Sequence, residues 1–138
     1  MGQRKKAREL VLKCLYAYDS THQPVESIVE TLIKTSELEA ESQRFAEQLL
    51  SHVITLMEDL DGQISRVSQN WDISRLAMVD KCILRMAICE FSRFPDIPAK
   101  VSINEAVELA KKYSTQESSR FVNGILDAVY KSLEPSDV

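Results

Sequence analysis

Apolar residues recur along this 138-residue chain at the spacing of an α-helix almost throughout. Near the start they follow the i, i+3, i+4, i+7, i+8, i+11 pattern, which places them on one stripe of a helix. The stripe consists of Ala7, Leu10, Val11, Cys14, Leu15 and Tyr18. No segment alternates with a period of two for long enough to predict a β-strand. The pattern predicts an all-α protein of about seven helices.

Turn-forming residues divide the first half of the chain. Residues 19–23 are polar, and Pro24 suits the first position of a second helix because proline lacks an N–H there at no cost. A long amphipathic run from about residue 39 to residue 69 is consistent with one helix. Gly62 costs that helix about 1 kcal/mol relative to alanine, which does not require a break. Trp71 and the three residues after it look like a turn.

In the second half, prolines and capping residues set the boundaries. An apolar helix ends before residues 94–98 (FPDIP), because each proline biases its predecessor away from the helical region. Residues 102–105 (SINE) and 114–117 (STQE) have the spacing of a capping box and predict two further helix starts. We expect one domain over residues 1–138, built from two small packed bundles, an N-terminal subdomain of about 1–70 and a C-terminal subdomain of about 71–138.

Composition excludes several classes of protein. No apolar run approaches the roughly 18 residues that a membrane span requires, and the basic start lacks the features of a signal peptide, so we expect a cytoplasmic protein. Three cysteines, Cys14, Cys82 and Cys89, lie among apolar residues without a CxxC spacing, which favours buried reduced thiols. No nucleophile, phosphate-loop or metal-binding motif is visible. We therefore expect no enzyme activity, no metal and no cofactor.

The charge distribution is asymmetric. The net charge is −4. Residues 26–61 contain nine acids and two bases, a formal charge of −7, whereas residues 1–13 contain five bases and one acid, a formal charge of +4. Such segregation presents one cationic face to a polyanion.

The first helix carries the candidate site. At about 100° per residue, Arg4, Lys5, Arg8, Leu12 and Tyr16 fall to one side of the apolar stripe. Cations that neutralise phosphates beside an aromatic ring that stacks on a base are the means by which proteins bind single-stranded nucleic acid. The alternative is that the basic start is ordinary surface charge and that Tyr16 packs on a neighbouring helix.

A second candidate lies between the last two predicted helices. Lys112 and Tyr113 end one helix, and the residues from Glu117 onward open the next, where free backbone N–H groups can bind phosphate. Farther along, Gly124 lies inside a helix, which suggests that another backbone approaches closely. We interpret Gly124 and its neighbour Asn123 as packing residues.

Four segments together are recognisable: ARELVLKCLYAYD, LAMVDKCILRMAICEF, PDIPAKVSINEAVELAKKYS and SSRFVNGILD. They resemble the NusB family of bacterial transcription antitermination factors, over the chain from Arg4 to about Leu133. The resemblance implies an all-helical fold and a function without covalent chemistry. Together with NusE, a ribosomal protein, the family binds boxA RNA of nascent ribosomal RNA transcripts. It joins other Nus factors and RNA polymerase, suppresses premature termination and aids ribosomal RNA biogenesis.

The resemblance also implies site residues. Its RNA-binding positions correspond to Arg4, Lys5, Lys6, Arg8, Tyr16, Lys112, Tyr113, Glu117 and Ser118, and its protein-partner position corresponds to Asp80. One departure concerns the turn, because many members have glycine where this chain has Ser114. A left-handed helix C-cap would cost serine more than glycine.

Two rival functions remain open. One is the RNA-binding module of a ribosomal RNA methyltransferase, whose catalytic domain we do not find within the 138 residues. The other is a non-enzymatic helical scaffold that binds only protein, including a homodimer that buries the RNA face.

Overall fold

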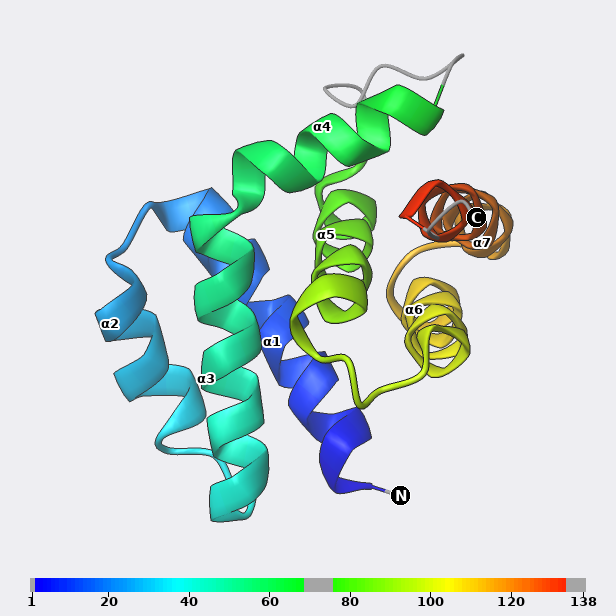
Figure 1. Ribbon diagram of the computed structural model, residues 1–138. Helices are drawn as coiled ribbons and strands as arrows, with labels where there is room; N and C mark the ends of the chain where they lie inside the picture. The colour runs from blue at the N-terminus through cyan, green and yellow to red at the C-terminus, as the bar shows by residue number, and fades with distance from the viewer. Residues whose placement is uncertain (1, 69–75, 134–138) are drawn as a thin grey trace. The chain divides into compact units, whose positions relative to one another are not determined.

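The computed structural model describes residues 2–68 and 76–133, and these form seven α-helices and one π-helical turn without a strand (Figure 1). This confirms the all-α prediction. Two compact units are present, Met1–Thr55 and Leu56–Val138. The predicted turn around Trp71 lies outside the described residues.

The first unit contains α1 (Gln3–Thr21), α2 (Val25–Ile28), the π-helical turn η1 (Val29–Ile33) and α3 (Ala40–Thr55). Helix α1 packs on α3 and also contacts α2 and η1. Pro24 precedes α2 as its N-cap rather than occupying the first helical position. The core consists of the α1 stripe and the apolar face of α3, with Ala7, Val11, Cys14, Leu15, Ala46, Leu49, Leu50 and Val53 all buried.

The long amphipathic run is not one helix. It breaks at Leu56, whose φ of −102° and ψ of 14° depart from helical values, and α4 (Met57–Val67) follows. Gly62, the residue that the sequence marked as the weak point, lies inside α4. The break comes earlier because α4 belongs to the second unit, where it contacts α5 and α7. The division between units therefore falls after Thr55 instead of near residue 70.

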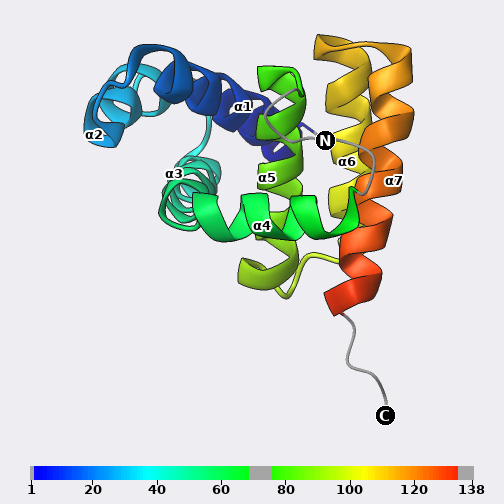
Figure 2. The same cartoon turned by 90° about the horizontal axis from the view of Figure 1, so that it is seen from above.

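The second unit is built around α5 (Met78–Arg93), which packs on α4, α6 (Ala99–Tyr113) and α7 (Gln116–Leu133). Residues 82–90 of α5 are all buried. Arg85 donates two hydrogen bonds to the Asp61 carboxylate of α4, at 2.8 and 3.0 Å. Helices α6 and α7 lie side by side (Figures 1 and 2). Buried polar pairs of this kind fix which helix faces meet.

Both predicted capping boxes need correction. Helix α6 starts at Ala99 after Pro98, so Ser102 lies inside the helix, and its hydroxyl donates to Glu90 at 2.6 Å. At α7 the capping residue is Thr115, whose Oγ1 accepts the Ser118 N–H at 2.9 Å. In α6, Ser102 bonds to Glu90 of another helix instead of capping its own helix. In α7, the capping residue lies one position later than predicted.

Candidate nucleic-acid interface

The start of α1 concentrates positive charge. Arg4, Lys5 and Lys6 are exposed, no acid occupies the first turn, and the N-cap residue Gly2 supplies no side-chain cap. The N-terminus of a helix already carries a partial positive charge, so each cation there costs roughly 0.3–1 kcal/mol at low ionic strength. This end of α1 is therefore suited to an anion.

Arg4 and Arg8 both lie against Phe45 of α3, and they differ in exposure. The guanidinium carbon of Arg4 is 4.0 Å from the ring centroid, and that of Arg8 is 5.6 Å away. Arg4 is exposed, whereas Arg8 is only 4% exposed. The expectation that Arg8 faces solvent is wrong, because the buried stripe of α1 is wider than predicted and also includes Leu12. Arg8 is a packing cation, and Arg4 is the arginine open to a ligand.

Tyr16 is 46% exposed, so its ring does not pack fully on a neighbouring helix. Eleven residues separate it from Lys5, which at 100° per residue places the two side chains within about 20° of each other around α1. The two backbone positions lie about 16 Å apart along the helix axis, at 1.5 Å per residue. This exposed flank of α1 combines charge with a stacking surface.

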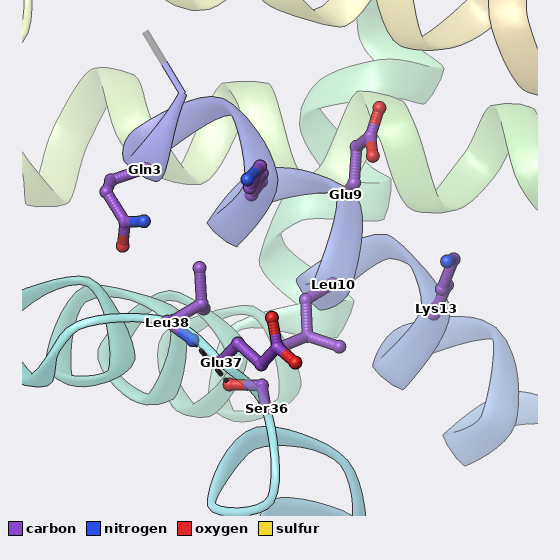
Figure 3. Close-up of a pocket in the computed structure, with 8 residues that line it drawn as sticks. Gln3, Glu9, Leu10, Lys13, Ser36, Glu37 and Leu38 are labelled. Carbon is purple, nitrogen blue, oxygen red and sulfur yellow. Dashed lines mark hydrogen bonds between the residues drawn. The ribbon is translucent and has the colours of Figure 1, made fainter.

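The opposite flank of α1 carries a different surface. Lys6 and Lys13 line an open cavity of about 420 Å³ between α1 and the segment that follows η1 (Figure 3). Glu9 and Glu37 line the same cavity, with Leu10 and Leu38 between the charges. Because one carboxylate from each wall lines the same space as the two lysines, its mixed charge attracts RNA less than the Tyr16 flank does.

At the other predicted region, α6 ends with Lys112 and Tyr113. The Lys112 ammonium lies 5.4 Å from the centroid of the half-buried Tyr113 ring. Ser114 follows with a φ of −127°, so it is not in the left-handed region. The serine at this position therefore imposes no left-handed strain on the turn.

The N-terminus of α7 is already occupied by carboxylates. Glu117 is exposed in its first turn, and the Ser118 hydroxyl donates to Asp80 Oδ2 at 3.0 Å. Asp80 is 6% exposed, and its buried Oδ1 has no hydrogen-bond partner in the described part of the chain. The Asp80 carboxylate is thus largely covered within the second unit, and it lies where a phosphate would otherwise be attracted.

The remaining candidate groups are structural. Cys14, Cys82 and Cys89 are buried and free, and burial raises the pKa of Cys14 and of Cys89 to about 12. Among residues 2–68 and 76–133 we find no group of side chains that could hold a metal ion and no helix able to cross a membrane.

Phe45 is the residue that sequence reasoning missed. It lies on α3, far along the chain from the arginines that it contacts, and in sequence it is indistinguishable from other members of an amphipathic face. Only the packing of α3 on α1 identifies it.

Comparison with known proteins gives a consistent result. The sequence profile of the NusB family matches residues 5–131. The transcription antitermination protein NusB of Chloroherpeton thalassium is 39% identical over 98% of this chain, which spans 64% of that relative's length. The structure is similar to NusB of T. maritima, with a TM-score of 0.88, 34% identity and coverage of 96% and 93%. It is also similar to a chain of the NusB–NusE complex with double-stranded RNA, with a TM-score of 0.85, 25% identity and coverage of 96% and 98%.

Proposed function

Because this chain belongs to the NusB family, we propose that it is an RNA-binding transcription antitermination factor. It binds boxA RNA of nascent ribosomal RNA transcripts, suppresses premature termination and aids ribosomal RNA biogenesis. Its action is binding, without covalent chemistry, and takes place in the cytoplasm where transcripts emerge.

The observation that carries this proposal is the concentration of exposed cations at the start of α1, whose first turn holds no acid, on the same helix as the exposed Tyr16 ring. Arg4 and Lys5 neutralise phosphates, and Tyr16 stacks on a base that is not paired. Lys112 and Tyr113 are further RNA-binding residues in this proposal, on the second unit, whereas Glu117 and Ser118 shape that region without attracting phosphate. Single-stranded RNA is favoured because its bases are free to stack.

NusE is the proposed protein partner, because the NusB chain with which this fold is shared is bound to NusE and RNA. Asp80 acts within the molecule in this proposal. Its hydrogen bond to Ser118 fixes the start of α7 relative to α5, so it positions that region for its partners instead of touching them.

A titration of labelled boxA RNA tests the proposal, alone and with NusE, at several salt concentrations. We expect binding that tightens with NusE and weakens linearly on a logarithmic salt scale, with a slope of about −0.7 for each neutralised phosphate. A double-stranded competitor should displace the label poorly. The charge-neutral variant Lys5→Gln should lower the slope, and Lys34→Gln, an exposed lysine of the first unit outside the site, is the matched control. Equal binding by both variants would place the RNA elsewhere.

The rival scaffold function makes a different prediction. A homodimer that buries the Tyr16 flank would elute as a dimer in gel filtration without RNA and would exclude boxA.

A further inference from the structure

Two features of the chain are not explained by the Tyr16 flank of α1. One is Gly124, which is exposed on α7 beside the exposed Asn123. A Cβ built on Gly124 would meet no heavy atom within 4 Å, so the prediction that another backbone of this chain approaches it is wrong. The other feature is the cavity between α1 and the segment that follows η1, and only this one offers groups that could hold a ligand.

The cavity, which we call the α1–η1 cavity, lies within the first unit (Figure 3). Its volume is about 420 Å³, and ligand sites in proteins commonly measure about 300–1,000 Å³. Residues 36–38 form one wall. The other wall is α1, which contributes Gln3, Lys6, Glu9, Leu10 and Lys13.

Hydrogen bonds hold the wall of residues 36–38 in place. The Ser36 hydroxyl donates to the Ile33 carbonyl at 2.7 Å and accepts the Leu38 N–H at 3.4 Å. The Gln3 side chain of α1 accepts the Glu39 N–H at 2.9 Å, so it ties the two walls together. The shape of the cavity is therefore set by the fold before any ligand binds.

The chain enters this wall from a π-helical turn. In η1 the Lys34 N–H donates to the carbonyl of Val29, five residues earlier, at 2.9 Å. Turns of this kind are rare and occur frequently at functional sites. The position of η1 next to the cavity is thus a second observation in favour of a site.

The charged groups of the cavity have opposite signs on its two walls. Lys6 and Lys13 are exposed on α1, and neither makes an ion pair within the described residues. Glu37 of the other wall is also exposed and makes none with any described residue, and its carboxylate extends toward α1 (Figure 3). Leu10 and Leu38 supply apolar surface. The cavity thus offers donors on one side, an acceptor on the other and apolar contact between them.

A guanine base matches this arrangement. Its O6 and N7 atoms accept hydrogen bonds from a lysine, and its N1–H and 2-amino groups donate to a carboxylate. Uracil offers a carboxylate only one N–H, which lies between two carbonyl oxygens, and adenine has no oxygen for a lysine. The mixed charge that disfavours a phosphate backbone therefore suits a base whose two edges have opposite hydrogen-bonding character.

We propose that the α1–η1 cavity binds one unpaired guanine of the RNA strand. Lys13 donates to the O6 and N7 edge, and Glu37 accepts from N1–H and the 2-amino group. Leu10 and Leu38 cover the ring, and Lys6 binds the adjoining phosphate. This inference rests on the proposed RNA-binding function and adds to it a subsite that distinguishes bases.

The place of the cavity on α1 favours a strand of RNA as its occupant. Gln3 and Lys6 lie in the first turns of the helix, next in sequence to the exposed Arg4 and Lys5. A strand whose phosphates bind at this end of α1 can pass around it, from the Tyr16 flank to the cavity. Stacking on Tyr16 tolerates any base, whereas the cavity selects one.

The test measures base preference, because the ratio of two affinities is insensitive to the overall charge of a variant. The probes are labelled single strands of nine uridines and the nine strands in which one guanosine replaces each uridine in turn. We expect guanine at one position to tighten binding at least about fivefold relative to the uridine strand. Inosine, which lacks the 2-amino group, should lose most of that gain, and adenosine should not produce it.

Substitutions on the two walls assign the preference to the cavity. Glu37→Gln should reduce the guanine preference to less than about twofold, even though the loss of a negative charge tightens binding of the uridine strand. Guanosine and inosine should then bind alike, which completes a double-mutant cycle between protein and base. Lys13→Gln should also lower the preference. Glu30→Gln and Lys34→Gln, two exposed residues beside the cavity that do not line it, are the matched controls and should keep it.

The outcomes separate the subsite from the function on which it rests. Equal affinity for all strands, or a guanine preference that survives Glu37→Gln, would overturn the subsite and leave RNA binding intact. No binding by any strand would overturn the proposed function and the subsite with it. Guanosine monophosphate at the concentration of the strand should not displace it; displacement would assign the cavity to a free nucleotide and overturn its role in RNA binding.

Discussion

Phe45 is buried, and replacing it by leucine should nevertheless weaken RNA binding. The substitution removes the ring that lies 4.0 Å from the Arg4 guanidinium and 5.6 Å from that of Arg8, and it keeps an apolar side chain on α3. A cation–π contact is worth about 0.5–1 kcal/mol at an exposed site such as Arg4, and about 2 kcal/mol for a desolvated pair such as Arg8.

The two contacts affect two different measurements, the stability of the protein and its affinity for RNA. The loss at Arg8 and the change of side-chain shape lower the free energy of unfolding by about 1–3 kcal/mol. Without the ring, the Arg4 side chain is no longer held in position to bind a phosphate. The energy of the lost cation–π contact corresponds to a loss of about two- to fivefold in RNA affinity. Urea unfolding measures the first effect, and anisotropy of labelled boxA RNA measures the second.

Two matched variants make the result interpretable. Phe45→Tyr keeps the ring, so it should retain RNA affinity even where the new hydroxyl lowers stability at this buried site. Val53→Ala, also on α3 and fully buried, removes about 1.6 kcal/mol of apolar burial without touching either arginine. It should therefore destabilise the protein and leave RNA binding unchanged. Wild-type affinity of Phe45→Leu across a range of salt would show that the Arg4–Phe45 contact does not serve RNA.

The other predictions concern single sites. Tyr16→Ala should weaken RNA binding by about 1–3 kcal/mol in an anisotropy titration with little change in stability, because the exposed ring stacks on a base; unchanged binding would remove the ring from the site. Arg8→Ala should instead lower the free energy of unfolding by about 2 kcal/mol in urea, since the side chain is buried against Phe45, and a fully stable variant would contradict that role. Asp80→Ala should cost about 1–3 kcal/mol by leaving the Ser118 hydroxyl without its acceptor, and a double-mutant cycle with Ser118→Ala should reveal the coupling; additive effects would exclude it. Cys14 and Cys89 stay protonated in the folded state up to pH about 12, whereas their pKa is near 9.0 in the unfolded chain. Their contribution to the free energy of unfolding is therefore complete below pH 9 and is lost as the pH rises toward 12. Urea titrations at pH 8 and pH 10 should show that loss, and it should shrink in Cys14→Ala.

The sequence predicted helix type and number because apolar periodicity is a local signal that packing reinforces. Its errors arose where a distant residue decided the local outcome. Ser102 fitted a capping box, but Glu90 of α5 accepts its hydroxyl and α6 starts at Ala99. Arg8 lay outside the apolar stripe on a helical projection, but Phe45 of α3 covers it. Single-helix geometry contains no information about either contact.

The candidate site, too, could be predicted only in part from the sequence. The cationic start of α1 and the exposed Tyr16 were predictable, because both appear on one helix. Asp80 was assigned to a partner surface from its position in the family pattern alone, and its burial against Ser118 depends on how α5 meets α7. Alignment with a functional position of the family therefore does not show whether the side chain is exposed.

The start of α1 shows how a candidate surface can be recognised from a local anomaly. Three exposed cations lie where the helix dipole is already positive, and no acid occupies the first turn. This placement has a local cost for the isolated chain, and an anion bound at this end of the helix would offset it. A local rule broken at an exposed surface indicates a contact that forms outside the chain. At α1 the sign of the charge favours a polyanion, and RNA is the polyanion that the proposed function supplies.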